Sequence, residues 1–253
     1  VRGRRPGRRP GRRGPVAAGP GGGAARPPRG VLFDAGGTLV QVHVERLAGA
    51  LRERGCDPVG LDDAFWRTLA MLDSEFGPSA GGWESWFDHW LDHLAGRSRV
   101  PPTAMREAWW AADRELHLWD LPVPGATECL RRLGEAGLRL GIVSNADGRI
   151  AGALRRAGLD ELVEVVVDSG VVDVAKPDPR IFSHALGPLG LRPEEAWYLG
   201  DTVAYDAAGA RAAGLVDWLV DHRGLQSRPH PRRVSSLGQF ADAVLAARVP
   251  PPV

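Results

Sequence analysis

Carboxylate side chains follow two short apolar segments of this 253-residue chain. Asp34 comes directly after the apolar residues 31–33, and Asp201 and Asp206 follow residues 196–199. Carboxylates that converge in one cleft repel each other unless a hard cation joins them, and Mg²⁺ takes such oxygen ligands while it keeps sites for water and phosphate. An aspartate beside a glycine turn can also be only a turn former or a helix cap. We expect the three aspartates to form a magnesium site.

Lys176 is the only lysine among the 32 basic residues, and all the others are arginine. An ammonium is a compact point charge on a flexible stem, whereas a guanidinium is a broad planar fork. This composition indicates that position 176 requires the shape of lysine. Its charge suits a phosphate oxygen, and it also suits a carboxylate that must stay ionised for nucleophilic attack. The alternative is a solvated lysine in a loop.

Ser144 and Asn145 follow a third apolar segment, residues 138–143. Their hydroxyl and amide, together with the main-chain N–H groups of a strand-to-helix turn, can hold an anion. Capping of the next helix is the alternative, and one hydroxyl can serve both purposes. Gly36 and Gly37 stand in the loop after the first carboxylate and let the main chain approach a ligand closely. We therefore expect Asn145 and Gly37 to contact the substrate.

Alternating strand and helix patterns position these residues. Such alternation indicates a parallel sheet with helices on both faces, a Rossmann-like α/β core. Ligands of these sheets bind beyond the carboxyl ends of the strands, so Asp34, Ser144 and Asp201 should meet in one crevice. The expected strands cover residues 31–33, 138–143, 163–167, 196–199 and 215–220, and the expected helices cover 126–136, 150–157, 179–186, 204–213 and 237–247.

The segment from about residue 43 to residue 120 has helical periodicity instead. Aromatic and leucine residues recur there at spacings of three and four, as in Trp83, Trp86, Phe87, Trp90, Leu91 and Leu94, and seven of the nine tryptophans lie between Trp66 and Trp119. We expect these rings to form the packed core of a small helical bundle, and the alternative is a wall that faces the substrate. The chain then divides into a tail (1–29), an α/β core (30–41 and 121–253) and an inserted helical region (42–120).

Charge is distributed unevenly along the chain. Nine of the 32 basic residues and no acidic residue lie in residues 1–30, so 23 basic residues face 31 acidic ones in the rest, a net charge of about −8. An acidic body argues against nucleic-acid binding, which needs a basic surface. The Arg-, Pro- and Gly-rich tail is expected to be disordered.

Membrane insertion and disulfide bonding are not expected either. No run of about 18 apolar residues is present, so we expect no transmembrane helix. Cys56 and Cys129 are too few for a disulfide framework and lack metal-site spacing. We expect a cytoplasmic protein that acts on a small molecule, and the sequence does not indicate its oligomeric state.

Four short sequence motifs of this chain resemble, in order and spacing, the motifs of the haloacid dehalogenase superfamily of hydrolases. The resemblance extends over residues 31 to about 221 and rests on Asp34-Ala35-Gly36-Gly37-Thr38-Leu39, Ser144-Asn145, Lys176-Pro177, and Gly200-Asp201 with Asp206. It implies a Mg²⁺-dependent phosphatase that forms an aspartyl-phosphate on Asp34. It also implies that residues 42–120 are the family's helical cap, which closes over the site and selects the substrate.

The resemblance also assigns roles to individual residues. It implies that the metal is bound by Asp34, the carbonyl of Gly36 and Asp201, with Asp206 in the outer shell. The transferring phosphoryl group carries the charge that most needs stabilisation. It would be held by Thr38, Ser144 and Lys176.

Gly36 departs from the family's phosphatases, which usually have an acid/base aspartate at this position. General acid–base catalysis by such a group typically raises the reaction rate roughly 10²–10⁴-fold. We therefore expect slow turnover or a long-lived phospho-enzyme. The substitution Gly36→Asp should then raise the rate. A histidine of the insert, His43, His89 or His93, could replace the missing group, although a solvated surface histidine is the alternative.

Two rival functions follow from the same departure. Dehalogenases of the superfamily also lack this aspartate, but they need no metal, whereas Asp201 is kept here. A binding or regulatory protein that has lost catalysis is the other rival. Phosphonate cleavage is disfavoured because the insert contains no lysine. The sequence does not name the substrate.

Overall fold

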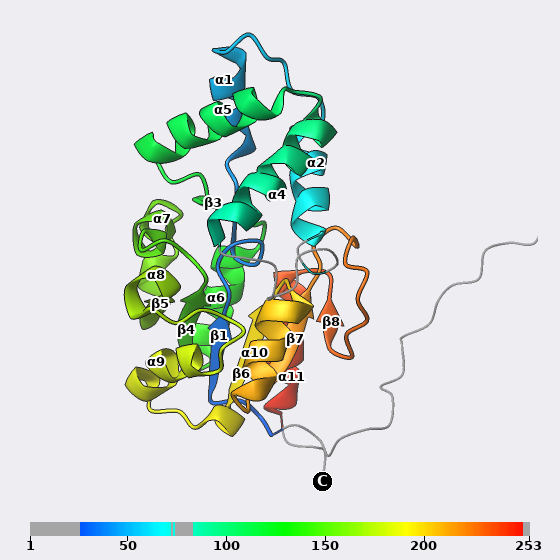
Figure 1. The fold of residues 1–253 in the computed structure, drawn as a ribbon. Helices are drawn as coiled ribbons and strands as arrows, with labels where there is room; N and C mark the ends of the chain where they lie inside the picture. The colour runs from blue at the N-terminus through cyan, green and yellow to red at the C-terminus, as the bar shows by residue number, and fades with distance from the viewer. Residues whose placement is uncertain (1–25, 72, 74–82, 250–253) are drawn as a thin grey trace, which may run out of the picture.

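The computed structural model describes residues 26–71, 73 and 83–249. Figure 1 shows a β-sheet with a group of helices beyond one end of its strands. The first 25 residues of the tail that we expect to be disordered lie outside the described residues. Arg29 already belongs to the core, because its N–H donates to the Glu195 carbonyl at 2.8 Å and its side chain forms an ion pair with Glu195 at 3.1 Å.

The core is a six-stranded parallel sheet, which confirms the predicted Rossmann-like α/β class. Its strand order is β5-β4-β1-β6-β7-β8. The strands are β1 Gly30–Phe33, β4 Arg139–Ser144, β5 Val165–Asp168, β6 Ala196–Gly200, β7 Val216–Val220 and β8 Arg233–Val234. Strand β8 was not predicted, because two residues are too short to show a period.

Strand β1 lies in the middle of the sheet between β4 and β6, with Phe33 beside both Ile142 and Leu199. All four of its residues are buried, as expected for a strand covered by helices on both faces. The N–H of Asp34 continues the ladder and donates to the Leu199 carbonyl at 2.8 Å. The carboxyl end of β1 is therefore fixed between the ends of its two neighbours.

Helices cover both faces of the sheet. Side chains of α6, α7 and α11 pack in one apolar cluster with Val31 and Phe33, and side chains of α9 and α10 pack in a second with Leu32. The alternation along β1 thus supplies both cores. The helices are α6 Ala126–Glu135, α7 Ile150–Arg156, the short α8 Ser169–Val172, α9 Arg180–Leu189, α10 Ala208–Ala212 and α11 Leu237–Ala247.

The helix predicted over residues 204–213 begins differently. A π-helical turn, Val203–Ala207, precedes α10. Thr202 and Asp206 bond each other reciprocally: the Thr202 N–H and hydroxyl donate to Asp206 Oδ2 at 3.0 and 2.5 Å, and the Thr202 hydroxyl accepts from the Asp206 N–H at 3.2 Å. The turn fixes the carboxylate of Asp206 beside the end of β6.

The helical insert is joined to the core by two crossing segments. Strands β2 (Val40–Gln41) and β3 (Leu121–Pro122) pair in antiparallel fashion where the chain enters and leaves it. Figure 1 shows the insert beyond the carboxyl edge of the parallel sheet. Its helices are α1 Val44–Arg52, α2 Leu61–Ala70, α4 Trp83–Ser98 and α5 Pro102–Glu115.

Aromatic rings form much of the core of this insert. Trp90 is buried and meets Phe65 edge to face at 6.2 Å and Trp109 at 5.4 Å between ring centroids. The side chains of Trp83 and Trp86 lie outside the described residues. In the part of the chain that the structure describes, no helix combines the length and apolar character needed to span a membrane.

Candidate active site

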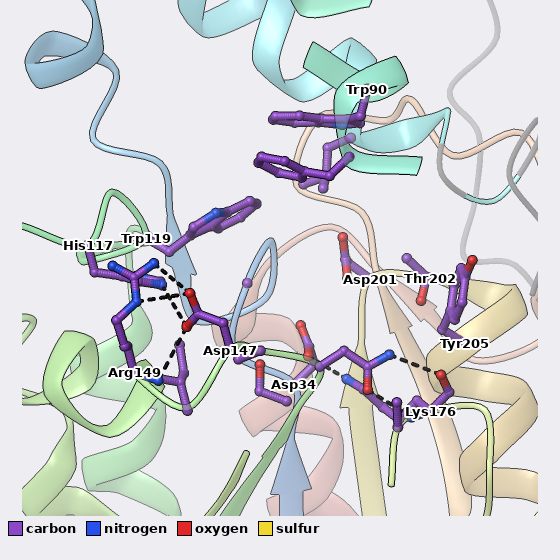
Figure 2. Close-up of a pocket in the computed structure, with 18 of the residues that line it drawn as sticks. Asp34, Trp90, His117, Trp119, Asp147, Arg149, Lys176, Asp201, Thr202 and Tyr205 are labelled. Carbon is purple, nitrogen blue, oxygen red and sulfur yellow. Dashed lines mark hydrogen bonds and ion pairs between the residues drawn. The ribbon is translucent and has the colours of Figure 1, made fainter. Parts of the chain in front are cut away.

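A cavity of about 330 Å³ lies where the carboxyl edge of the sheet faces the helical insert (Figure 2). One side of the cavity, which we call its floor, is formed by residues of the four sequence motifs. They are Asp34, Gly36, Ser144, Asn145, Lys176, Asp201 and Asp206. Parallel strands bring the motifs together, because β1, β4 and β6 are neighbours and end at one edge.

Lys176 connects two of the carboxylates of the floor. Its Nζ donates to Asp34 Oδ1 at 2.5 Å, to Asp206 Oδ1 at 2.8 Å and to the Tyr198 hydroxyl at 3.0 Å, and the side chain is buried. Burial acts to lower the pKa of Lys176, but the charges of Asp206 and Asp34 outweigh it and raise the pKa. The ammonium is therefore held protonated next to the predicted nucleophile.

Asp34 is enclosed by protein, and burial raises its pKa to about 6. The charge of Lys176 opposes this rise, and the nearby charge of Asp206 adds to it. Lys176 thus keeps a buried carboxyl group ionised near neutral pH, as a nucleophile requires.

The carboxylate of Asp206 is saturated with hydrogen bonds. Its Oδ1 accepts from Lys176 and from the Tyr198 hydroxyl at 2.8 Å each, and its Oδ2 accepts two bonds from Thr202. Burial acts to raise the pKa of Asp206, but Lys176 and these donors outweigh it and lower the pKa. Because a carboxylate has about four lone-pair sites, the side chain is occupied in orienting Lys176.

Asp201 lies beside the other two carboxylates and remains partly exposed. One oxygen each of Asp34, Asp201 and Asp206 lie within 4.8 Å of one another. Enclosure in the protein raises the pKa of Asp201 well above its usual range, and the charges of Asp206 and Asp34 raise it further. A divalent cation would remove this repulsion, so the donor set fits Mg²⁺, with Asp34 and Asp201 as the carboxylates whose oxygens are least committed.

Gly37 explains how the loop after β1 passes so close to Asp201. Its φ is +80°, and a Cβ at this position would lie 2.4 Å from Asp201 Oδ2. A side chain here would therefore displace the carboxylate. Gly37 does not line the cavity, so its predicted contact with substrate stays a prediction, while the structure gives it a role in making room.

Asn145 is bonded at both ends of its amide to the main chain of Lys176. Its Oδ1 accepts from the Lys176 N–H at 2.8 Å, and its Nδ2 donates to the Lys176 carbonyl at 3.0 Å. The side chain thereby holds the Lys176 loop against the end of β4. Ser144, the last residue of β4, is buried and lines the cavity.

Thr38 is buried and does not line the cavity. Its hydroxyl finds no hydrogen-bond partner among the described residues. The predicted contact between this hydroxyl and a phosphoryl group stays a prediction.

The cavity histidine is His117, which sequence reasoning missed. The three histidines considered from the sequence, His43, His89 and His93, do not line the cavity. Burial lowers the pKa of His117, and the charge of Asp113 opposes this. The only sequence feature that could have indicated His117 as a cavity residue is its position, shortly before the chain leaves the insert.

The wall opposite the floor is aromatic. We call this set the aromatic wall: Phe87, Trp90, Trp109, Trp110 and Trp119. The bundle core predicted from the aromatic stripe is present, because Trp90 and Trp109 are buried in the insert. Both rings also line the cavity, and the alternative, a wall that faces the substrate, stays a prediction.

Trp119 lies against position 36, where family phosphatases have a second aspartate. A Cβ on Gly36 would lie 3.2 Å from two atoms of the Trp119 ring. Such a distance requires the neighbour to move by a few tenths of an ångström, and a carboxylate extends further than a Cβ. The improvement predicted for Gly36→Asp alone therefore needs Trp119 to move.

A group of charged residues lines one side of the cavity, and we call it the ion cluster. Arg149 Nη2 lies 2.5 Å from both Asp113 Oδ2 and Asp147 Oδ2, and Nη1 donates to the Asp113 carbonyl at 3.0 Å. Asp113 belongs to α5 of the insert, whereas the other two residues follow β4. The ion cluster thus joins insert and core beside the cavity, and Figure 2 shows its core residues, Arg149 and Asp147, side by side.

Comparison with known proteins identifies the family. The family model for haloacid dehalogenase-like hydrolases matches residues 28–214. The chain is 35% identical over 219 residues to the glyceraldehyde 3-phosphate phosphatase of Methanopyrus kandleri, which covers 84% of this chain and 91% of that protein. It is 36% identical over 138 residues to the human haloacid dehalogenase-like hydrolase domain-containing protein 3, a match that covers 52% of this chain and only 55% of the human protein.

A solved structure agrees with this assignment. It is a hydrolase of the same family from Deinococcus radiodurans with bound phosphate and sodium; the TM-score is 0.60 at 27% sequence identity, over 87% of this chain and 96% of that one. With the four motifs gathered at one cavity and the family model covering most of the chain, this protein belongs to the haloacid dehalogenase-like hydrolases.

Proposed function

We propose that the protein is a Mg²⁺-dependent phosphohydrolase that cleaves a small phosphate monoester with Asp34 as the nucleophile. The observation that carries the proposal is the buried bridge from Lys176 to Asp34 and Asp206, next to Asp201, on the floor of the cavity. The phosphatase among the relatives and the phosphate in the related structure support the same chemistry. Family membership alone does not separate phosphatases from dehalogenases.

The residues of the floor divide the work of phosphoryl transfer. A carboxylate oxygen of Asp34 forms a bond to phosphorus, and the ester P–O bond breaks with its electron pair on the departing oxygen. Water then attacks the aspartyl-phosphate, which releases phosphate and restores Asp34. The ammonium of Lys176 holds Asp34 ionised before attack and offsets charge on the phosphoryl oxygens afterwards.

Other groups would orient the phosphoryl group and the metal. Ser144 faces the cavity. The Thr38 hydroxyl, which has no hydrogen-bond partner among the described residues, would have to turn toward the cavity to bond a phosphoryl oxygen. Asp34 and Asp201 would hold Mg²⁺ with the Gly36 carbonyl, and the ion would neutralise charge on the transferring group. Asp206 serves this site by orienting Lys176.

The helical insert would act as a cap over this chemistry. It contributes the aromatic wall and Asp113 to a cavity whose floor belongs to the core. Exclusion of water from such a cavity strengthens the electrostatic contribution of Lys176 and lengthens the life of the aspartyl-phosphate.

Phosphate release from a panel of small phosphate esters, with Mg²⁺ or with a chelator, tests the proposal. Asp34→Asn is the blank, and Asp178→Asn is its matched control, because Asp178 lies on the same loop as Lys176 and its ion pair among the described residues is with the exposed Arg180. We expect metal-dependent release that is lost in Asp34→Asn and kept in Asp178→Asn. Metal-independent halide release from a 2-haloacid would instead establish a dehalogenase, and silence in both assays would favour a non-catalytic protein.

A further inference from the structure

We propose that the preferred substrate is an aryl phosphate monoester, in which an uncharged aromatic ring is bonded through oxygen to phosphorus. This inference rests on the proposed phosphohydrolase function and adds the class of the leaving group. Three features of the cavity support it: the aromatic wall, the charge of the ion cluster and the contact between Gly36 and Trp119.

The aromatic wall determines which leaving group fits opposite the floor. Phe87 stacks on Trp90 at 5.6 Å with 17° between the ring planes and meets Trp109 edge to face at 5.4 Å. An aromatic ring bound against them could make the same offset-stacked or edge-to-face contacts. A polyhydroxylated leaving group would bury against these rings every hydroxyl that does not reach the ion cluster, and each hydroxyl left unpaired would lose roughly tenfold in affinity.

The ion cluster determines which charge is accepted at the side of the cavity. Its single guanidinium, Arg149, already has both Asp113 and Asp147 at 2.5 Å, so the three side chains carry a net charge of −1. A carboxylate or a second phosphate on the leaving group would meet this negative charge instead of a free cation. An uncharged leaving group avoids that repulsion.

The contact between Gly36 and Trp119 determines how the leaving group departs. No side chain at position 36 can donate a proton, and the Trp119 ring lies where such a side chain would begin. Figure 2 shows the ring of Trp119 above Asp34, on the cavity side. Among the described residues of the cavity wall, Asp113 and Asp147 are ion-paired with Arg149 and are poor proton donors. His117 also lines the cavity, but burial lowers its pKa, so its imidazole is neutral near pH 7 and is a poor acid as well.

A leaving group that departs without a proton must be a stable anion. A phenol has a pKa of about 10, whereas the pKa of water, which is close to that of a simple alcohol, is about 15.7. A phenolate can therefore leave without general acid catalysis far more readily than an alkoxide. The aromatic ring that makes the anion stable is also the group that the wall accommodates.

Steady-state kinetics with matched esters tests the inference. We would compare Mg²⁺-dependent kcat/KM for phenyl phosphate, cyclohexyl phosphate, glycerol 3-phosphate and 4-carboxyphenyl phosphate. We expect phenyl phosphate to exceed the two alkyl esters by ~10²-fold or more and the carboxylated ester by ~10-fold. Equal values for glycerol 3-phosphate, or for the carboxylated ester, would overturn the assignment.

A series of substituted phenyl phosphates tests the role of position 36. In the wild type, log kcat/KM should fall steeply as the pKa of the phenol rises. In Gly36→Asp/Trp119→Ala the dependence should become shallow, because an acid can then protonate the departing oxygen. A shallow dependence in the wild type would show that another group already donates the proton and would refute the unassisted departure.

Binding supplies a readout independent of turnover. We would measure phenylphosphonate and inorganic phosphate by calorimetry with wild type, Trp119→Leu and, as the matched control, Trp218→Leu, whose ring stacks on Trp197 outside the cavity. The ratio of the two affinities should fall ~10-fold in Trp119→Leu and stay unchanged in Trp218→Leu. An unchanged ratio in both variants would count against the aromatic wall.

Acetyl phosphate separates a failure of this inference from a failure of the proposed function. Acetate leaves without a proton and carries no ring, so its hydrolysis reports on the floor alone. Turnover of acetyl phosphate without a preference for aryl esters would overturn the inference and leave the function standing. No turnover of any of these compounds would overturn both.

Discussion

Replacing Lys176 with methionine removes the cation that holds the floor of the cavity together. Methionine keeps the unbranched shape of lysine, so the change is mainly one of charge. The ammonium lies 2.5 Å from Asp34 Oδ1 and 2.8 Å from Asp206 Oδ1, away from solvent. Removing one partner of a buried ion pair costs about 3–5 kcal/mol, because the remaining charge is left uncompensated.

That cost is large relative to the free energy of unfolding, which is about 5–15 kcal/mol for most proteins. For a chain of this size each kcal/mol changes the melting temperature by about 2–4 °C, so Lys176→Met should melt roughly 6–20 °C below the wild type. The measurement is a thermal melt in a chelator, so that no added cation replaces the ammonium. The matched control, Arg180→Met, removes an exposed cation that pairs with Asp178 and should change the free energy of unfolding by less than about 0.5 kcal/mol.

Activity should fall in the same variant. Without Lys176 the pKa of Asp34 would rise further above about 6, since the lysine charge lowers it in the wild type. Less of the nucleophile would be ionised, and one electrostatic contact to the phosphoryl group would be lost, which together should reduce kcat by ~10²-fold or more. A variant that melts within 2 °C of the wild type and keeps its kcat would refute the view that Lys176 organises the site.

Three further substitutions test separate parts of the structure. Asn145→Ala should lower kcat about tenfold with little change in KM, because only the orientation of Lys176 is lost; an unchanged kcat would contradict that role. Asp217→Asn should lower the free energy of unfolding by about 3 kcal/mol in urea titrations, because this buried carboxylate, outside the cavity, is ion-paired with Arg211 and Arg232 and hydrogen-bonded with His230. Its kcat at 25 °C should stay the same, and a loss of activity in the folded variant would contradict this. Burial lowers the pKa of His117, so the unfolded chain binds this proton more tightly and wild-type stability should fall as pH drops below about 6.5. His117→Asn should lose less stability between pH 7.5 and pH 5.5, and an equal loss would refute the burial argument.

Long periodic elements of the fold could be predicted from the sequence. Helix α11 has the predicted bounds, Leu237–Ala247, and each of the five predicted strands is present within a few residues. Strands β2, β3 and β8 escaped prediction because each has two residues and no period. The π-helical turn before α10 escaped because it depends on bonds between Thr202 and Asp206 that a hydrophobic pattern does not encode.

The sequence allowed us to predict that the motifs lie close together, but it did not allow us to predict which contacts each side chain makes. Parallel strands place their carboxyl ends at one edge, so Asp34, Ser144 and Asp201 had to be neighbours once the strands were assigned. Whether Asn145 faces the substrate or the main chain of Lys176 depends on one rotamer. The same holds for Asp206, whose two oxygens are used by donors within the protein.

Gly36 shows why a missing functional group cannot be judged from one motif. From the sequence alone, Gly36 only marks the loss of an acid/base aspartate, and the single substitution Gly36→Asp should restore that group. In the structure, the ring of Trp119 occupies the space that a side chain at position 36 would need. Trp119 lies 83 positions further along the chain, just before β3, where the insert returns to the core. Two distant positions are therefore coupled by packing: the small residue admits the ring, and the ring excludes the acid. The pair creates an apolar surface above Asp34, and a substrate that leaves as a stable anion suits both this surface and the absence of an acid at position 36.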